Sequence, residues 1–120
     1  MLQVYTGTGK GKTTAALGVA FRGAGYGLKT TMFSFLKDDP NYGEARAAGV
    51  LPGFVLKQVG RDEFVNFYDP DPIDLQMVRD GWELAKLAIS NREADIIILD
   101  ELNIVLATNM LPTEEVAEFL

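Results

Sequence analysis

The 120-residue sequence contains neither cysteine nor histidine. Without cysteine there is no disulfide framework, no thiolate nucleophile and no cysteine-based zinc site. Without histidine the usual imidazole base and metal ligand are absent too, which excludes most hydrolase triads and zinc enzymes. The sequence also lacks an apolar run of the ~18 residues that a membrane span needs, and its start does not resemble a signal peptide. We therefore expect a cytoplasmic protein with no membrane partner.

The rest of the composition is that of an ordinary globular protein. The hydrophobic fraction is 48% and the charged fraction 23%, and the chain length suits a single domain. The net charge of −6 is unevenly divided, because residues 1–60 hold seven basic and three acidic side chains, whereas residues 61–120 hold four and 14. An acidic chain is repelled by nucleic acid backbones, so we expect no nucleic-acid partner. The basic half can still hold a small anion.

Strand-like and helix-like segments alternate along the chain. Short apolar or β-branched runs predict strands at residues 2–6, 29–35, 54–59 and 96–99, the last buried on both faces. Helices are predicted at residues 13–21, buried against a sheet, in a turn at 44–48, and in a final amphipathic stretch from residue 111. This alternation predicts an α/β fold with a mainly parallel sheet, whose ligands bind at the carboxyl ends of the strands.

The longest predicted helix begins at Asp71 and Pro72, a capping residue followed by a residue favoured at the first helical position. Helical spacing places a set of apolar residues on one face, and we expect Trp82 among them to be a core residue. The residues of this face are Leu75, Val78, Trp82, Ala85 and Ile89.

A glycine-rich loop follows the first predicted strand. Gly7, Gly9 and Gly11 allow the backbone to curl around an anion, Lys12 adds a positive charge, and Thr13 adds a hydroxyl for a metal. The loop is a shortened variant of the P-loop pattern, because its first glycine comes one residue late. A plain glycine turn would not account for the two lysines. The residues expected to contact the nucleotide are Gly7, Thr8, Gly9, Lys10, Gly11, Lys12, Thr13 and Thr14.

A pair of carboxylates, Asp100 and Glu101, closes the last predicted strand. Alone, this pair would be interpreted as an acidic helix cap. Together with the glycine loop it predicts a Mg²⁺ site beside the phosphates of ATP or GTP, formed by Thr13, Asp100 and Glu101.

Three strings together carry a resemblance to a known family: residues 5–18 around the glycine loop, Phe35-Leu36-Lys37, and Asp100-Glu101-Leu102-Asn103. The sequence resembles the ATP:corrinoid adenosyltransferases of the P-loop class, from Tyr5 to about Leu120. The resemblance implies a RecA-like P-loop fold and transfer of the 5′-deoxyadenosyl group of ATP to Co(I) of a corrinoid, with release of triphosphate. Lys10 and Lys12 would stabilise the leaving triphosphate together with Mg²⁺.

The same resemblance implies ATP and Mg²⁺ as cofactors, a reduced corrinoid as substrate, an electron-donating flavoprotein as partner, and a homodimer. With no histidine to ligate cobalt, apolar and aromatic side chains would have to hold the corrin, and Phe64, Phe67 and Tyr68 are the candidates. Simple core packing is the alternative interpretation of these three residues.

The sequence also departs from the family pattern. Thr8 stands where the family commonly has Asn, and Ser34 where it commonly has Gln. Family members continue with a further strand and a substrate-covering segment, and the further strand lies between the first strand and the Asp100 strand. We therefore expect residues 1–120 to be a single P-loop nucleotide-binding domain that is truncated at its C-terminus. Two alternatives to the transferase remain open: a P-loop kinase or ATPase, and an ATP-binding module without turnover.

Overall fold

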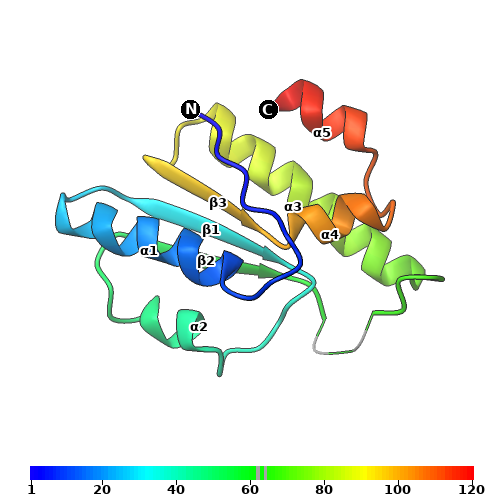
Figure 1. Ribbon diagram of the computed structural model, residues 1–120, viewed down its shortest axis with the longest axis horizontal. Coiled ribbons are helices and arrows are strands. Elements are labelled where there is room, and N and C mark those ends of the chain that lie inside the picture. The colour runs from blue at the N-terminus through cyan, green and yellow to red at the C-terminus, as the bar shows by residue number, and fades with distance from the viewer. Residues whose placement is uncertain (62, 64) are drawn as a thin grey trace.

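The computed structural model describes residues 1–120 except residues 62 and 64. Its elements, in chain order, are α1 (Lys12–Gly25), β1 (Thr30–Phe35), α2 (Gly43–Ala47), β2 (Phe54–Val59), α3 (Pro72–Ser90), β3 (Ile96–Asp100), α4 (Leu102–Ala107) and α5 (Thr113–Phe119). The three strands form a parallel sheet in the order β2-β1-β3 (Figure 1). The predicted α/β class and parallel sheet are thus confirmed.

Helices cover both faces of this sheet. One apolar cluster joins β1 to α3, α4 and α5, and a second cluster joins the opposite face of the sheet to α1 and the α2 region. The central strand β1 is buried along its whole length. Trp82 is fully buried in the first cluster and meets the ring of Phe119 edge-on, which confirms the prediction that it is a core residue.

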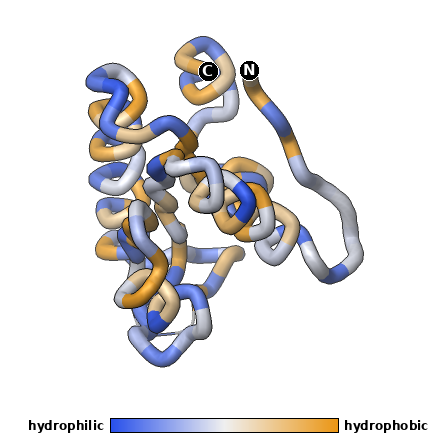
Figure 2. The backbone as a smooth tube through the Cα atoms, turned by 90° about the vertical axis from the view of Figure 1, so that its left-hand side faces the viewer, coloured by the Kyte–Doolittle hydropathy of each residue, from blue (hydrophilic) through white to orange (hydrophobic). Residues whose placement is uncertain are grey.

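The predicted strand at residues 2–6 is not formed. In Figures 1 and 2 this segment runs along the outside of the molecule toward α1, and its apolar side chains Leu2, Val4 and Tyr5 are exposed. A strand requires a neighbouring strand to complete its hydrogen bonds, and among the described residues β3 pairs with β1 alone. A β-prone sequence without a partner therefore stays outside the sheet.

The helix α1 and the strand β3 are less buried than the sequence predicted. In α1 only Ala20 and Gly23 are buried, and Phe21 is 71% exposed. The strand β3 is only partly buried because it lies at the sheet edge. In α3 the buried face turns slightly from the predicted one, since Leu75 is exposed whereas Ala88 is buried.

Asp71 precedes α3 as predicted, but its side chain makes no cap hydrogen bond. Its carboxylate instead pairs with Arg61, at 2.9 Å, and the same guanidinium donates at 2.8 and 2.6 Å to the buried Asp74. The hydrogen bonds to Asp74 and Asp71 raise the pKa of Arg61. This ion-pair cluster ties the segment after β2 to the first turn of α3.

A close approach between α3 and β2 yields a prediction about stability. A Cβ atom added at Gly81 would overlap the side chain of Val59, whereas a Cβ at Gly18, in the exposed part of α1, meets nothing within 4 Å. Gly81→Ala should therefore lower the free energy of unfolding by about 1–3 kcal/mol. Gly18→Ala, the matched control, should raise it by about 0.5–1 kcal/mol through helix propensity. Thermal and urea unfolding measure both, and two stabilised variants would contradict the packing described here.

Candidate functional site

The carboxyl ends of the three parallel strands lie at one edge of the sheet, and the glycine loop lies at the same edge (Figure 1). Gly7 has a φ of 140° and Gly11 a φ of 106°, a region that disfavours any side chain. Gly11 is also the N-cap of α1 and supplies no side-chain oxygen to the first turn. The N–H groups at the start of this 14-residue helix are therefore left available to an anion.

Lys12 folds its side chain across the loop that precedes it. Its Nζ atom donates hydrogen bonds to the carbonyl oxygens of Gly7, at 2.9 Å, and Gly9, at 2.7 Å. The ammonium is thus held over the concave side of the loop. Both bonds are exposed to solvent, so a phosphate oxygen can replace the carbonyls at little cost.

Asp100 connects the loop to the sheet. The Thr13 hydroxyl donates to one oxygen of Asp100 at 2.8 Å, and the Lys37 ammonium donates to the other at 2.9 Å. Glu101 lies 3.6 Å from the same ammonium. Asp100 is 8% exposed, so this contact between residues 87 positions apart is largely shielded from water. Two of the predicted metal-site residues, Thr13 and Asp100, are in direct contact, and Glu101 is adjacent.

Lys37 keeps its positive charge at this site. Burial of its ammonium lowers its pKa, but the hydrogen bond and charge of Asp100 and the charges of Glu101 and Glu44 outweigh that effect, so the pKa of Lys37 is raised. The site therefore brings together two lysine ammonium groups, Lys12 and Lys37, with the carboxylates of Asp100 and Glu101. Such a mixture suits a phosphate chain accompanied by a cation.

The backbone turns sharply where the chain leaves two of the strands. Leu36, just after β1, and Glu101, just after β3, both adopt left-handed backbone conformations, with φ of 64° and 65°. Non-glycine residues in this region carry strain that tends to cluster at functional sites. After these turns Lys37 contacts Asp100, and Glu101 lies beside the ammonium of Lys37.

Sequence reasoning missed Lys37 as a site residue, although its position directly after a buried strand was an available signal. It also missed Asn103, whose side-chain amide donates to the carbonyl oxygen of Tyr5 at 3.0 Å and so fastens the segment before the loop to α4. In contrast, the side chains of Thr8, Lys10 and Thr14 are exposed and form no hydrogen bond or ion pair within the described part of the chain.

The predicted corrin residues lie after β2. Phe67 is 37% exposed and Tyr68 fully exposed, so neither is simply a core residue. Both line an open hollow of about 560 Å³ whose other wall is the last residue of α4 and the turn after it, at residues 107–109. Phe64 falls outside the described residues.

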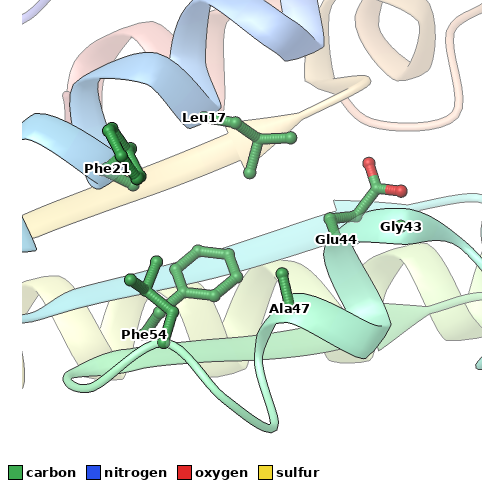
Figure 3. A pocket seen from close by; sticks show the side chains of 8 residues that line it. Leu17, Phe21, Gly43, Glu44, Ala47 and Phe54 are labelled. Atoms are coloured by element: carbon green, nitrogen blue, oxygen red, sulfur yellow. The ribbon is translucent and has the colours of Figure 1, made fainter.

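A second hollow, of about 250 Å³, lies between α1 and α2 (Figure 3). Leu17 and Phe21 of α1 face Ala47 and Phe54 across it, and the carboxylate of Glu44 stands at one end. Apolar walls and a carboxylate do not suit a phosphate chain, so we assign the anion site to the glycine loop.

Two properties of the described residues bear on the membrane and metal predictions. Within the described residues, none of the helices combines the length and apolar character of a membrane span. In the same part of the chain, no three acidic, cysteine or histidine side chains gather as a metal-binding group. A cation at Asp100 would therefore need oxygen ligands from Thr13, the nucleotide and water.

Comparisons with known proteins relate this chain to one family. The family model for the ATP:corrinoid adenosyltransferases BtuR/CobO/CobP matches residues 1–120. A corrinoid adenosyltransferase of Escherichia coli K12 is 37% identical over 117 residues, which are 98% of this chain and 59% of that protein. Corrinoid adenosyltransferase CobA of Salmonella typhimurium LT2 is 34% identical, with the same coverage, 98% and 59%.

An uncharacterised protein of Nostoc sp. PCC 7120 is 35% identical over 130 residues, 99% of this chain and 34% of that protein. The chain thus spans between one third and three fifths of the length of these curated relatives. Because the family model covers every residue from 1 to 120, the chain belongs to the ATP:corrinoid adenosyltransferase family.

Proposed function

We propose that this chain forms the P-loop nucleotide-binding domain of an enzyme that transfers the 5′-deoxyadenosyl group of ATP to a reduced corrinoid. The observation that carries the proposal is the contact between Thr13 and Asp100, which joins the glycine loop to the end of β3. Family membership adds the reaction class, because the similar proteins of Escherichia coli and Salmonella typhimurium are named corrinoid adenosyltransferases.

The residues of the site fit Mg²⁺ as a cofactor. The available donors are the Thr13 hydroxyl and the carboxylates of Asp100 and Glu101, all oxygens, which Mg²⁺ prefers. Mg²⁺ bound there would neutralise negative charge on the triphosphate. Lys12 would exchange its two loop carbonyls for phosphate oxygens, and the N–H groups at the start of α1 would hold the same chain of phosphates.

The proposed reaction needs no protein base. An electron pair of Co(I) forms a bond to the ribose 5′ carbon, the bond between that carbon and the triphosphate oxygen breaks, and its electron pair leaves with the triphosphate. Negative charge thus develops on the phosphates, where Lys12 lies, with the exposed Lys10 nearby on the loop. A sequence without histidine and cysteine can therefore support the reaction. Co(I) also requires a reductant, which we propose to be a cytoplasmic flavoprotein.

We propose the hollow lined by Phe67 and Tyr68 as part of the corrin site. Phe67→Ala should weaken corrinoid binding by about tenfold, because the variant loses an aromatic contact worth ~1.4 kcal/mol. Its affinity for ATP should stay unchanged, since Phe67 lies outside the glycine loop. Fluorescence titration with corrinoid and calorimetry with ATP separate the two effects. Equal loss of both affinities would mean that Phe67 is only structural.

Product analysis tests the proposed function. The purified chain is mixed with ATP, Mg²⁺ and a Co(I) corrinoid under anaerobic reduction, and both corrinoid and nucleotide products are identified. We expect a light-sensitive adenosylated corrinoid and an equal amount of triphosphate. ADP with phosphate would instead identify a kinase or ATPase, and binding of ATP without any product would identify a module that does not turn over.

A further inference from the structure

A row of polar side chains crosses the sheet at its carboxyl end. Ser34 of β1 is in register with Gln58 of β2 on one side and with Asp100 of β3 on the other. Neighbouring strands lie about 4.8 Å apart, so the three residues form one continuous row. Only Asp100 of this row was recognised from the sequence as a functional residue.

The row faces the side of the sheet that α1 covers. Side chains alternate between the two faces of a strand, and Met32, two residues before Ser34, packs in the cluster that contains Ala20 of α1. Ile98, two residues before Asp100, belongs to the same cluster. This face is therefore apolar in its middle and becomes polar in the row of Ser34, beside the Thr13–Asp100 contact.

The hydroxyl of Ser34 is buried and lacks a partner within the described part of the chain. Ser34 is 1% exposed, and none of the described residues forms a hydrogen bond with its Oγ atom. A buried hydroxyl left unpaired is unfavourable, so the Ser34 hydroxyl would gain free energy from a water molecule or a ligand atom that bonds it. Thr30 Oγ1 is likewise buried and unpartnered, but it lies at the opposite end of β1, about 13 Å from Ser34 along the strand. What distinguishes Ser34 is its place next to Asp100.

We propose that Ser34 is a positioning residue of the cation site, whose hydroxyl bonds a water molecule in the hydration shell of the Mg²⁺ held at Thr13 and Asp100. The inference rests on the proposed function and adds a residue to its site. Mg²⁺ keeps several of its waters when it binds protein and nucleotide, and one of these waters would give the buried Ser34 hydroxyl a hydrogen-bond partner. In the proposed complex the phosphates would be bound by the glycine loop and the start of α1, on the same face of the sheet as Ser34.

Calorimetry on three variants tests this role. Ser34→Ala removes the hydroxyl, Ser34→Cys replaces it by a somewhat larger thiol of the same connectivity that forms only weak hydrogen bonds, and Thr30→Val removes the matched hydroxyl far from the site. We expect both Ser34 variants to bind ATP about five- to tenfold more weakly than the wild type in Mg²⁺ and equally well in EDTA. Thr30→Val should match the wild type in both conditions. The thermal midpoint of ligand-free Ser34→Ala should not fall, because its hydroxyl has no partner there.

Three other results would contradict the proposed role of Ser34, and each has a different meaning. Wild-type affinity of both Ser34 variants in Mg²⁺ would show that the hydroxyl bonds nothing in the complex. An equal loss with and without Mg²⁺, or an equal loss in Thr30→Val, would show a structural effect unrelated to the cation. If the wild type itself gives no binding heat with ATP and Mg²⁺, the proposed function fails, and the inference fails with it.

Discussion

Replacing Lys12 by alanine is expected to weaken the binding of ATP with Mg²⁺ by about 100-fold, since charge-assisted hydrogen bonds to phosphate are worth together ~3 kcal/mol. The ammonium already lies over the loop, where it bonds the carbonyl oxygens of Gly7 and Gly9. It therefore needs no large movement to reach a phosphate. Calorimetry with ATP and Mg²⁺ measures the change.

Turnover should fall further than affinity. Triphosphate gains negative charge as it leaves, so the contribution of Lys12 is larger in the transition state, and we expect a loss of about 1000-fold in kcat/KM. Stability should change little, because both loop carbonyls are exposed and water can replace the ammonium. Circular dichroism and thermal unfolding verify that the variant is folded.

Lys29→Ala is the matched control for Lys12→Ala. Lys29 is exposed and lies just before β1, at the opposite end of the strand from the site, and its removal changes the net charge by the same amount. Its affinity for ATP should equal that of the wild type. Unchanged activity in Lys12→Ala would contradict both the transferase and the phosphoryl-transfer hypotheses, because either reaction needs this charge. Equal losses in the two variants would point to overall charge as the cause.

The elements that could be predicted from the sequence are those whose signals are local. The bounds of β2 match the prediction because its β-prone run is preceded by Pro52 and Gly53 and followed by Gly60. The start of α3 follows from Asp71 and Pro72. The segment at residues 2–6 has an equally good local pattern, but a strand depends on a neighbour that no local pattern reveals. The predicted burial of α1 was wrong for the same reason, because the burial of a helix depends on which other segments pack against it.

The residues of the candidate site show the same difference between local and tertiary signals. The glycine loop and Asp100 are recognisable because each forms a short motif, and the structure brings Thr13 and Asp100 together. Lys37 and Ser34 lie in or beside a string that resembles the family, but that string assigns neither of them a role at the site. They enter the site because β1 lies between β2 and β3 in the sheet, so that its end meets Asp100 although 63 or more residues separate them in the chain. Strand order is a tertiary property, so the contact of these residues with the site is established only by the fold.

Replacing Asp100 by asparagine should remove the dependence of ATP binding on Mg²⁺. Asparagine keeps the shape of the side chain, and its oxygen can still accept a hydrogen bond from the Thr13 hydroxyl. It lacks the negative charge, however, and its amide group cannot form an ion pair with the ammonium of Lys37. We expect ATP with Mg²⁺ to bind about 10- to 100-fold more weakly, the usual effect of losing a group that holds or orients a metal ion. ATP in EDTA should bind as it does to the wild type.

Asp100→Asn should also reduce stability. Asp100 is 8% exposed and pairs with Lys37, whose side chain is 21% exposed, so the substitution leaves a partly buried ammonium without its main partner. The free energy of unfolding should fall by about 1–3 kcal/mol. Urea unfolding measures this loss, and the variant must still be folded at the temperature of the calorimetry.

Asp95→Asn is the matched control, because it makes the same chemical change just before β3, at the end of the strand far from the site. The Asp95 carboxylate is exposed and, among the described residues, accepts a hydrogen bond from the backbone N–H of Lys29 alone. This variant should keep the Mg²⁺ dependence of the wild type. A second comparison, Glu101→Gln, separates the two acidic residues: Glu101 is more exposed and 3.6 Å from Lys37, so we expect a smaller effect than at Asp100. If Asp100→Asn retained the full Mg²⁺ dependence, the cation would have to bind elsewhere, and Asp100 would serve only to join Thr13 and Lys37.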